Sequence, residues 1–177
     1  MLKLRYSTVP VISAIRGMAL GGGCELAVYS SKRVAAMESY IGLVEVGVGL
    51  LPAGGGLKEL AQRVAAWAKG GDAFPELQRV FKQIAMGETS KSAHDARERG
   101  FLREGDVIVF HPAELLYVAR QQARAMDESG VRPQLPPPQI PVAGDTGIAT
   151  LKMLLVNMKE GAFISQHDFD ICSRVAE

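Results

Sequence analysis

The sequence predicts an α/β fold in which helices cover a parallel sheet. Residues 9–15 are apolar at consecutive positions, which is typical of a strand buried on both faces. Three glycines at 21–23 separate this strand from residues 24–31, a segment with helical propensity. A second short strand is predicted at residues 32–39. The order strand, turn, helix, strand is typical of an α/β unit whose two strands run parallel.

The remainder of the chain is predicted to be mostly helical. Residues 40–56 are apolar and rich in glycine, and Pro52 and a final glycine triplet favour a loop before the next helix. Ser92 suits an N-cap, and Pro112 suits a first helical turn. Helical patterns cover residues 57–68, 74–87, 90–100, 111–130, 146–161 and 162–177.

Two regions are predicted within the chain. Residues 1–104 contain the strands and the glycine-rich turns, and residues 105–177 form a helical C-terminal region. Residues 131–141 contain three consecutive prolines and are predicted to be an extended linker, because proline disrupts helices and central strands. With 177 residues and 47% hydrophobic content, the chain is long enough to bury a hydrophobic core.

Charge and cysteine content exclude several function classes. The 20 basic and 19 acidic residues are spread along the chain, so no basic stripe for nucleic acid is present. No apolar stretch suits a signal peptide or a membrane span. Cys24 and Cys172 form no disulfide framework, and the three histidines lack metal-ligand spacing. We therefore predict a cytoplasmic protein without a metal site.

The glycines at 21–23 stand where a helix is predicted to begin. They let the backbone turn tightly and leave N–H groups at the helix N-terminus, where an anion or a developing oxyanion is stabilised. The oxyanion of a thioester enolate is one such group. The alternative is that the glycines only make a tight, close-packed turn.

Two glutamates are candidates for acid–base catalysis. Glu25 lies near the first turn of the predicted helix, although an acidic residue there can equally complement the helix dipole. Glu45 is the only charged residue between Glu38 and Lys58. A carboxyl group in so apolar a setting is expected to have a raised pKa, as a general acid requires, with Glu25 as the complementary base. The alternative for Glu45 is exposure at an edge or pairing with a lysine.

Two further interpretations of the glycine turn fit less well. A dinucleotide loop needs the pattern GxGxxG and an acidic residue roughly 20 positions later at the end of a strand, and this pattern is not cleanly met. Cys24 has no histidine near it in the sequence, so a small buried thiol explains it better than a nucleophile does.

The residues around both glutamates resemble a known family. The segments IRGMALGGGCELA and YIGLVEVGVGLLPAGGG are similar to the central signature of the crotonase superfamily, and the resemblance covers about residues 9–102. It implies a partial crotonase-like core, a spiral of ββα units, followed by the helical C-terminal region. It further implies that Gly22 supplies an oxyanion-hole N–H and that Glu25 and Glu45 are catalytic. The positions that the resemblance assigns to substrate binding are Gly21, Gly23, Gly49 and Pro52.

A second resemblance concerns the parent protein. Residues 70–90 and 141–171 resemble the hydratase-like C-terminal region of bacterial 3-hydroxyacyl-CoA dehydrogenases of fatty-acid β-oxidation. This implies hydration of trans-2-enoyl-CoA to 3-hydroxyacyl-CoA, with the acyl-CoA thioester as substrate. It implies no cofactor in this chain, since NAD would serve a dehydrogenase part that the chain does not contain. The alternatives are enoyl-CoA isomerisation, which usually needs one carboxylate, and a noncatalytic acyl-CoA-binding or assembly module.

The chain departs from the family pattern at two places. The strands that precede the signature in the family, with the turn that gives the second oxyanion N–H, would lie before Met1. We therefore expect this chain to be a piece whose activity is impaired in isolation. Ser30 and Ser31 stand where the family usually has Cys-Asp. A half domain exposes the flank of a buried strand, so we expect a homo-oligomer that associates along that surface.

Overall fold

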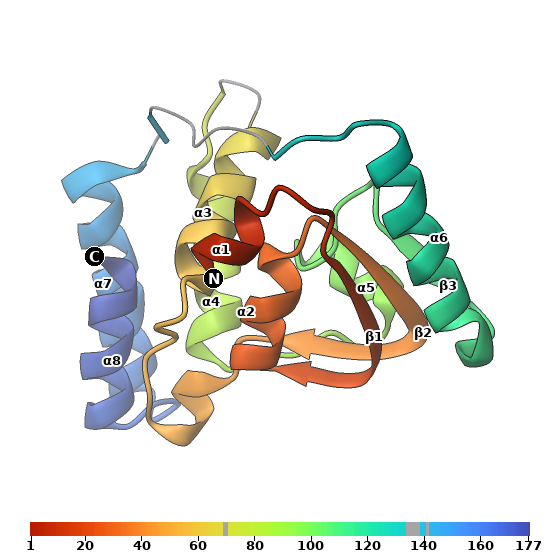
Figure 1. The fold of residues 1–177 in the computed structure, drawn as a ribbon. Coiled ribbons are helices and arrows are strands. Elements are labelled where there is room, and N and C mark those ends of the chain that lie inside the picture. The colour runs from red at the N-terminus through yellow and green to blue at the C-terminus, as the bar shows by residue number, and fades with distance from the viewer. Residues whose placement is uncertain (69–70, 134–138, 141) are drawn as a thin grey trace.

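A three-stranded parallel sheet with strand order β1-β2-β3 organises the computed structural model, which describes residues 1–68, 71–133, 139–140 and 142–177 (Figure 1). The α/β class predicted from the sequence is confirmed. Along the chain the elements are α1 (Leu2–Arg5), β1 (Ile12–Leu20), α2 (Gly22–Tyr29), β2 (Lys32–Gly42), η1 (Glu45–Val48), α3 (Gly56–Trp67), α4 (Phe74–Ala85), α5 (Ala93–Glu98), β3 (Val107–Val109), η2 (Pro112–Glu114), α6 (Leu115–Glu128), α7 (Gly144–Glu160) and α8 (Gln166–Ala176).

Strand β1 is the edge of the described sheet, and this overturns one prediction. The sequence predicts a first strand buried on both faces, but only Ile15 of β1 is buried and Met18 is 77% exposed. Alternate residues Ala14, Arg16 and Met18 are exposed, so one face of β1 is left uncovered, and β1 pairs with β2 alone among the described strands. The central strand β2 instead carries the continuous buried run, at residues 33–36.

The register of β1 and β2 brings the segments that follow them to one edge of the sheet. The pairing begins at Ile12 with Lys32 and ends at Leu20 with Gly42. Because parallel strands point the same way, the turn after β1 and the segment after β2 leave the sheet side by side. Both glutamates follow within five residues of these strand ends.

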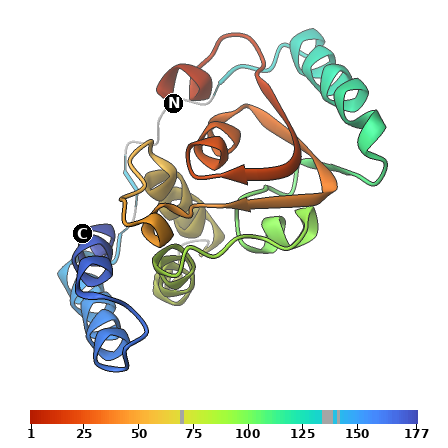
Figure 2. The ribbon, with the colours of Figure 1, turned by 90° about the horizontal axis from the view of Figure 1, so that it is seen from below.

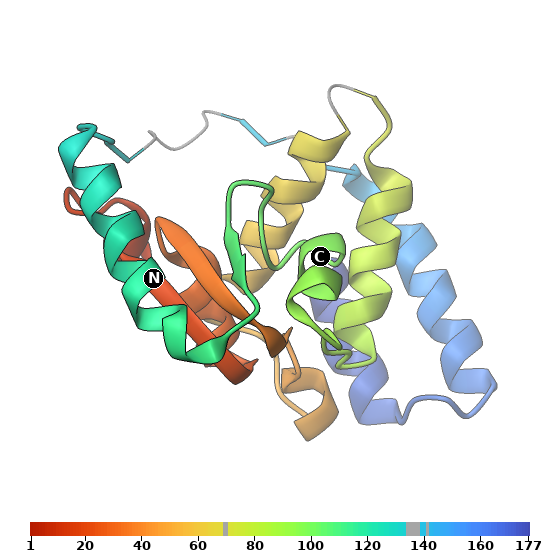
Figure 3. The ribbon, with the colours of Figure 1, turned by 90° about the vertical axis from the view of Figure 1, so that its right-hand side faces the viewer.

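Helices cover the sheet on both sides. Figure 2 shows α2 and α5 on opposite sides of β2, and α6 packs along β1 and β2. The pair α7 and α8 packs against α4, away from the sheet (Figures 1 and 3). Strand β3 was missed by the sequence analysis, because three residues are too few to give a strand-like periodicity. None of the described helices is long and apolar enough to cross a membrane.

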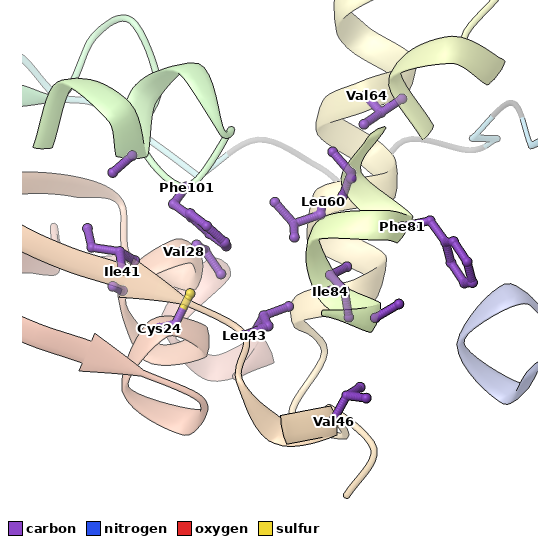
Figure 4. Close-up of a cluster of buried hydrophobic side chains, with 14 of the residues drawn as sticks. Cys24, Val28, Ile41, Leu43, Val46, Leu60, Val64, Phe81, Ile84 and Phe101 are labelled. Atoms are coloured by element: carbon purple, nitrogen blue, oxygen red, sulfur yellow. The ribbon is translucent and has the colours of Figure 1, made fainter. Parts of the chain in front are cut away.

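The main hydrophobic core lies between α2, β2, α3 and α4 (Figure 4). Leu60 and Val64 project from one face of α3, at the four-residue spacing that places side chains on a common side of a helix. A smaller cluster fills the space between the sheet and α6. The residues labelled in Figure 4 are Cys24, Val28, Ile41, Leu43, Val46, Leu60, Val64, Phe81, Ile84 and Phe101.

Two buried arginines donate hydrogen bonds to carbonyl groups at the C-terminal end of α2. Arg33 is 1% exposed, and its Nε donates to Oδ2 of Asp106 at 2.6 Å. Its Nη1 donates to the carbonyls of Val28 at 3.2 Å and Ser30 at 3.1 Å. Nη2 of Arg63 donates to the same Val28 carbonyl at 3.0 Å. Two guanidinium groups therefore satisfy carbonyls that the end of a helix leaves without partners.

Several local predictions can be compared with the helix ends. The Ser92 cap is confirmed, because its Oγ accepts a hydrogen bond from the Asp95 N–H at 3.1 Å. Pro112 lies in the first turn of η2, directly before α6. The linker predicted at 131–141 falls largely outside the described residues, which omit 134–138 and 141. The division into regions 1–104 and 105–177 stays a prediction.

Candidate active site

The first glycine turn joins the end of β1 to the start of α2. Gly21 has φ 53° and is the N-cap of α2, and its N–H donates to the Gly42 carbonyl at 2.9 Å. A side chain here is disfavoured by the positive φ, and a Cβ would also lie 3.3 Å from Oε1 of Glu45. Gly22 and Gly23 open the helix, are exposed, and border open space. The first N–H groups of a helix lack intrahelical partners, so Gly22 can donate to a ligand oxygen.

Glu25 is buried between the N-termini of two helices. It lies in the first turn of α2, is 4% exposed, and its Oε1 accepts the Gly56 N–H at the start of α3 at 2.9 Å. The loop before α3 closes around this carboxylate, since a Cβ on Gly54 would overlap its Oε2. Both helix dipoles have their positive ends here, which is a favourable setting for negative charge.

Glu45 is half-buried at the first position of η1. Its Oε1 lies beside Gly21, and its Oε2 is buried with no hydrogen-bond partner among the described residues. Burial raises the pKa of Glu45 above its ordinary value of 4.5, and the neighbouring charge of Glu25 adds to the rise, while backbone N–H groups at Val44 and Glu45 oppose it. This is the setting predicted for a general acid.

The two glutamates lie near the N-terminus of α2, and their carboxyl groups interact electrostatically. Glu25 belongs to the helix that Gly21 caps, Glu45 approaches Gly21 from the segment after β2, and the charge of Glu25 acts on Glu45. Within the described chain Glu45 forms no ion pair, so pairing with a lysine does not explain it. The arrangement places one hydrogen-bonded carboxylate and one desolvated carboxyl group beside exposed backbone N–H groups. Such a set can move protons next to a developing oxyanion.

Comparisons with known proteins place the chain in a family. The sequence model of the family described as "Enoyl-CoA hydratase/isomerase" matches residues 1–71. A probable 3-hydroxyacyl-CoA dehydrogenase of Bacillus subtilis (strain 168) is 42% identical over 176 residues, which are 99% of this chain and 22% of that protein. The chain belongs to the crotonase superfamily. The resemblance to that family is therefore confirmed, and the family model itself covers residues 1–71.

Further relatives of this crotonase chain are longer than it is. A short-chain-enoyl-CoA hydratase of Clostridium acetobutylicum is 32% identical over 121 residues, which are 68% of this chain and 40% of that protein. The crystal structure of an enoyl-CoA hydratase from Mycobacterium tuberculosis H37Rv matches with a TM-score of 0.55 and 24% identity, over 97% of this chain and 55% of that one. The chain thus spans less than half the length of the two relatives compared by sequence. The structural match supports the crotonase fold.

Gly49 and Pro52 of this crotonase chain lie in and after the C-terminal end of η1. Gly49 has φ 75°, and its carbonyl lies 3.0 Å from Nε2 of His167 in α8. A Cβ at Gly49 would lie 3.2 Å from the same nitrogen, so the position is tightly packed. Pro52 is buried in the loop before α3. The contacts of Gly49 are therefore with α8, and the substrate-binding roles of both residues stay predictions.

Cys24 is a core residue beside the site. It is fully buried (Figure 4), and burial raises the pKa of its thiol far above the ordinary value. Arg63 opposes this rise, and the charges of Glu45 and Glu25 add to it. Because the thiolate is the nucleophile, a thiol held neutral in this way suits packing. Among the described residues no group of three or more His, Cys, Asp or Glu side chains could hold a metal ion.

Sequence reasoning missed the role of the second glycine triplet. The sequence predicts only a loop before a helix at residues 54–56. In the structure Gly54 packs against the Glu25 carboxylate, and the Gly56 N–H donates a hydrogen bond to it. Gly55 has φ 106°, and its carbonyl accepts the Tyr29 hydroxyl at 3.0 Å. The sequence did hold one indication of this role, because both glycine triplets stand immediately before a predicted helix.

Proposed function

We propose that this chain carries the acid–base half of an enoyl-CoA hydratase site. The reaction is the hydration of trans-2-enoyl-CoA to 3-hydroxyacyl-CoA in fatty-acid β-oxidation, within a protein that also has a 3-hydroxyacyl-CoA dehydrogenase part. The observation that carries the proposal is the charge interaction between the buried Glu25 carboxylate, in the first turn of the helix that Gly21 caps, and the Glu45 carboxyl group beside Gly21. Its similarity to a short-chain-enoyl-CoA hydratase of Clostridium acetobutylicum and to a probable 3-hydroxyacyl-CoA dehydrogenase of Bacillus subtilis supports it.

The proposed chemistry adds water across a conjugated double bond. The thioester oxygen accepts a hydrogen bond from the Gly22 N–H, which draws electron density from C3 and stabilises the enolate oxygen as charge develops. A water molecule adds its oxygen to C3 and gives one proton to a carboxylate. C2 takes one proton from the other carboxyl group. One C–O bond and one C–H bond form, while one O–H bond of water and the π bond between C2 and C3 break, so the elements of water are conserved.

The two environments suggest how the roles divide. Glu45 has the raised pKa, so it suits the proton donor to C2. Glu25 is fixed by the Gly56 N–H, so it suits the base that orients water and accepts its proton. A proton transfer from Glu25 to Glu45 then restores the pair for the next turnover.

Two alternative functions, isomerisation and dinucleotide binding, fit the site less well. Isomerisation of enoyl-CoA needs the same oxyanion donor but usually one carboxylate, so a pair favours hydration. A dinucleotide would place its pyrophosphate at the N-terminus of α2, where it would face the charges of Glu25 and Glu45. These residues do not fit NAD, and the dehydrogenase chemistry belongs to another part of the proposed parent protein.

Separate removal of the two carboxylates tests the proposal. In the longer protein of which we expect this chain to be a piece, Glu25→Gln and Glu45→Gln should each lower the rate of crotonyl-CoA hydration by roughly 10²- to 10⁴-fold, measured from the ultraviolet absorbance of the conjugated thioester. Glu38→Gln is the matched control, because Glu38 is exposed on β2. Hydration that persists in both site variants would refute the assignment. Isomerisation with full tolerance of one substitution would favour the single-carboxylate reaction.

A noncatalytic module predicts a different result. Calorimetry with crotonyl-CoA would then record binding without any hydration by the 177-residue chain. Binding that weakens in a Gly22→Pro variant, which lacks the N–H, would still place the thioester at this turn.

Self-association is the proposed quaternary arrangement. Among the described strands only β2 pairs with β1, so the other edge of β1 can pair with a second chain, and Met18 is exposed on the same strand. Light scattering coupled to size exclusion should give a mass above that of one chain. A Met18→Lys variant should shift the equilibrium towards the monomer, whereas a monomeric wild type would contradict the proposal.

A further inference from the structure

A cavity of about 230 Å³ lies at the C-terminal end of α2, at the opposite end of that helix from the glutamate pair. Ser30 and Ser31, which follow α2 directly, form part of its wall. No aspartate or glutamate of the described chain lines it. Its polar side chains come from Arg5, Ser7, Ser30, Ser31, Arg103 and Arg132.

The arginines of this cavity carry more charge than their partners neutralise. Arg5 and Arg103 both donate to one oxygen, Oε1 of Glu59, at 3.2 and 2.7 Å. Arg63 donates to the same oxygen at 3.0 Å, so three guanidinium groups share a single carboxylate. Arg132 forms no ion pair in the part of the chain that the structure describes. The result is an excess of positive charge beside the cavity.

The lowered pKa of Arg63, which shares Glu59 with the cavity residues Arg5 and Arg103, agrees with this excess of positive charge. Burial lowers the pKa of Arg63 to about 10, and repulsion from Arg33 and Arg103 adds to the decrease. The negative charge of Glu59 opposes this decrease, but the same carboxylate also pairs with Arg5 and Arg103. Of Arg33, Arg63 and Arg103, only Arg103 lines the cavity, and an anion bound beside it would offset its part of the repulsion.

Two hydroxyl groups add hydrogen-bond donors to the same wall. Oγ of Ser31 accepts the Val11 N–H at 3.1 Å, and Oγ of Ser7 accepts the Val9 N–H at 3.3 Å. Neither hydroxyl donates to an acceptor among the described residues, so both protons are available to a ligand. The Ser30 hydroxyl, in contrast, donates to the Leu26 carbonyl at 2.9 Å.

We propose that this cavity binds the phosphate group of a phosphorylated small molecule. The planar guanidinium group matches phosphate with two parallel hydrogen bonds, and the serine hydroxyls supply further donors. A volume of 230 Å³ suits a phosphate or diphosphate group and is smaller than the pocket that a whole drug-sized ligand needs, roughly 300–1,000 Å³. The phosphate can belong to the nucleotide end of a CoA thioester or to a separate phosphorylated molecule. The site does not depend on the hydration reaction.

Titration calorimetry with pyrophosphate tests the cavity in the 177-residue chain. Arg132→Gln removes an exposed charge and should weaken binding about tenfold, which corresponds to about 1.4 kcal/mol. Ser31→Asp should weaken it at least as much, because the carboxylate can still accept the Val11 N–H but repels the ligand. Arg120→Gln is the control, since Arg120 is exposed on α6 and does not line the cavity. Equal affinity in all four proteins, or no binding of pyrophosphate to the wild type, would overturn the proposal.

Competition with CoA then identifies the source of the phosphate. If pyrophosphate displaces CoA and Ser31→Asp weakens both ligands equally, the site holds the nucleotide end of the thioester. If CoA binding is unchanged in Ser31→Asp while pyrophosphate binding is lost, the site holds a separate phosphorylated ligand. Either result supports a phosphate site. Pyrophosphate binding should persist in Glu25→Gln and Glu45→Gln, so failure of the hydratase proposal is distinguishable from failure of this one.

Discussion

Gly54→Ala is expected to destabilise the chain strongly, although it adds a single methyl group. The Cβ of an alanine at this position would overlap Oε2 of the buried Glu25 carboxylate. Gly54 is not among the glycines with positive φ, so its backbone conformation is open to alanine. The cost of the substitution therefore arises from displacement of Glu25 and not from backbone strain.

The magnitude follows from two contributions. Overpacking in a well-packed interior costs about 1–3 kcal/mol. Displacement of Glu25 also breaks the 2.9 Å hydrogen bond from the Gly56 N–H, and a bond to a charged group contributes about 1.5–3 kcal/mol. Together these give a loss of about 2.5–6 kcal/mol. Gly23→Ala is the matched control, because its Cβ would enter open space on a helix and should be neutral or stabilising by up to about 1 kcal/mol.

Urea unfolding of both variants, followed by circular dichroism, measures the two free energies of unfolding. The decisive experiment repeats Gly54→Ala in a Glu25→Ala background, where no carboxylate remains to collide with the added methyl group. There the cost of Gly54→Ala should fall below about 1 kcal/mol, as expected for residues coupled by direct contact. An equal cost in both backgrounds, or a Gly54→Ala variant as stable as the wild type, would refute the reasoning.

Three further predictions concern pH, buried charge and a helix cap. Because burial raises the pKa of Glu45, the folded chain keeps this proton to a higher pH than the unfolded chain does. The free energy of unfolding should therefore fall as pH rises from 4.5 through the raised pKa, and urea titrations at several pH values should show a smaller fall for Glu45→Gln. Asp106→Ala leaves Arg33 buried without its ion-pair partner and should cost about 3–5 kcal/mol in urea unfolding, against less than about 1 kcal/mol for Glu128→Ala in an exposed pair. Ser165→Ala removes the capping box of α8 and should cost about 1 kcal/mol by the same measurement.

The meeting of the two glutamates could be predicted because it follows from local patterns. A strand, a glycine turn, a helix and a second strand imply parallel pairing, and parallel strands end at one edge of a sheet. Glu25 and Glu45 each follow one of those strand ends, so their proximity needs no long-range information. The apolar surroundings of Glu45 also indicated its raised pKa, since no other charge lies near it in the sequence.

The buried ion pairs could not be predicted from the sequence. Arg33 and Asp106 are 73 residues apart, and each stands in a stretch where charged residues are usually exposed. Their burial depends on β3 pairing with β2, and β3 is too short to leave a periodic signal. The edge position of β1 was missed for a related reason, because an apolar strand sequence does not say how many neighbours the strand has.

The charged side chains near the two ends of α2 match the dipole of that helix. The helix has eight residues, which is too short to be stable alone, so contacts at its ends must hold it. Arg33 and Arg63 donate to the Val28 carbonyl near its C-terminus. Glu25 and Glu45 lie near its N-terminus. Each end therefore carries the charge that its dipole favours. The position of the Gly22 N–H is thus fixed by arginines at the far end of the helix, so loss of Arg63 would disturb a proposed oxyanion donor that it does not touch.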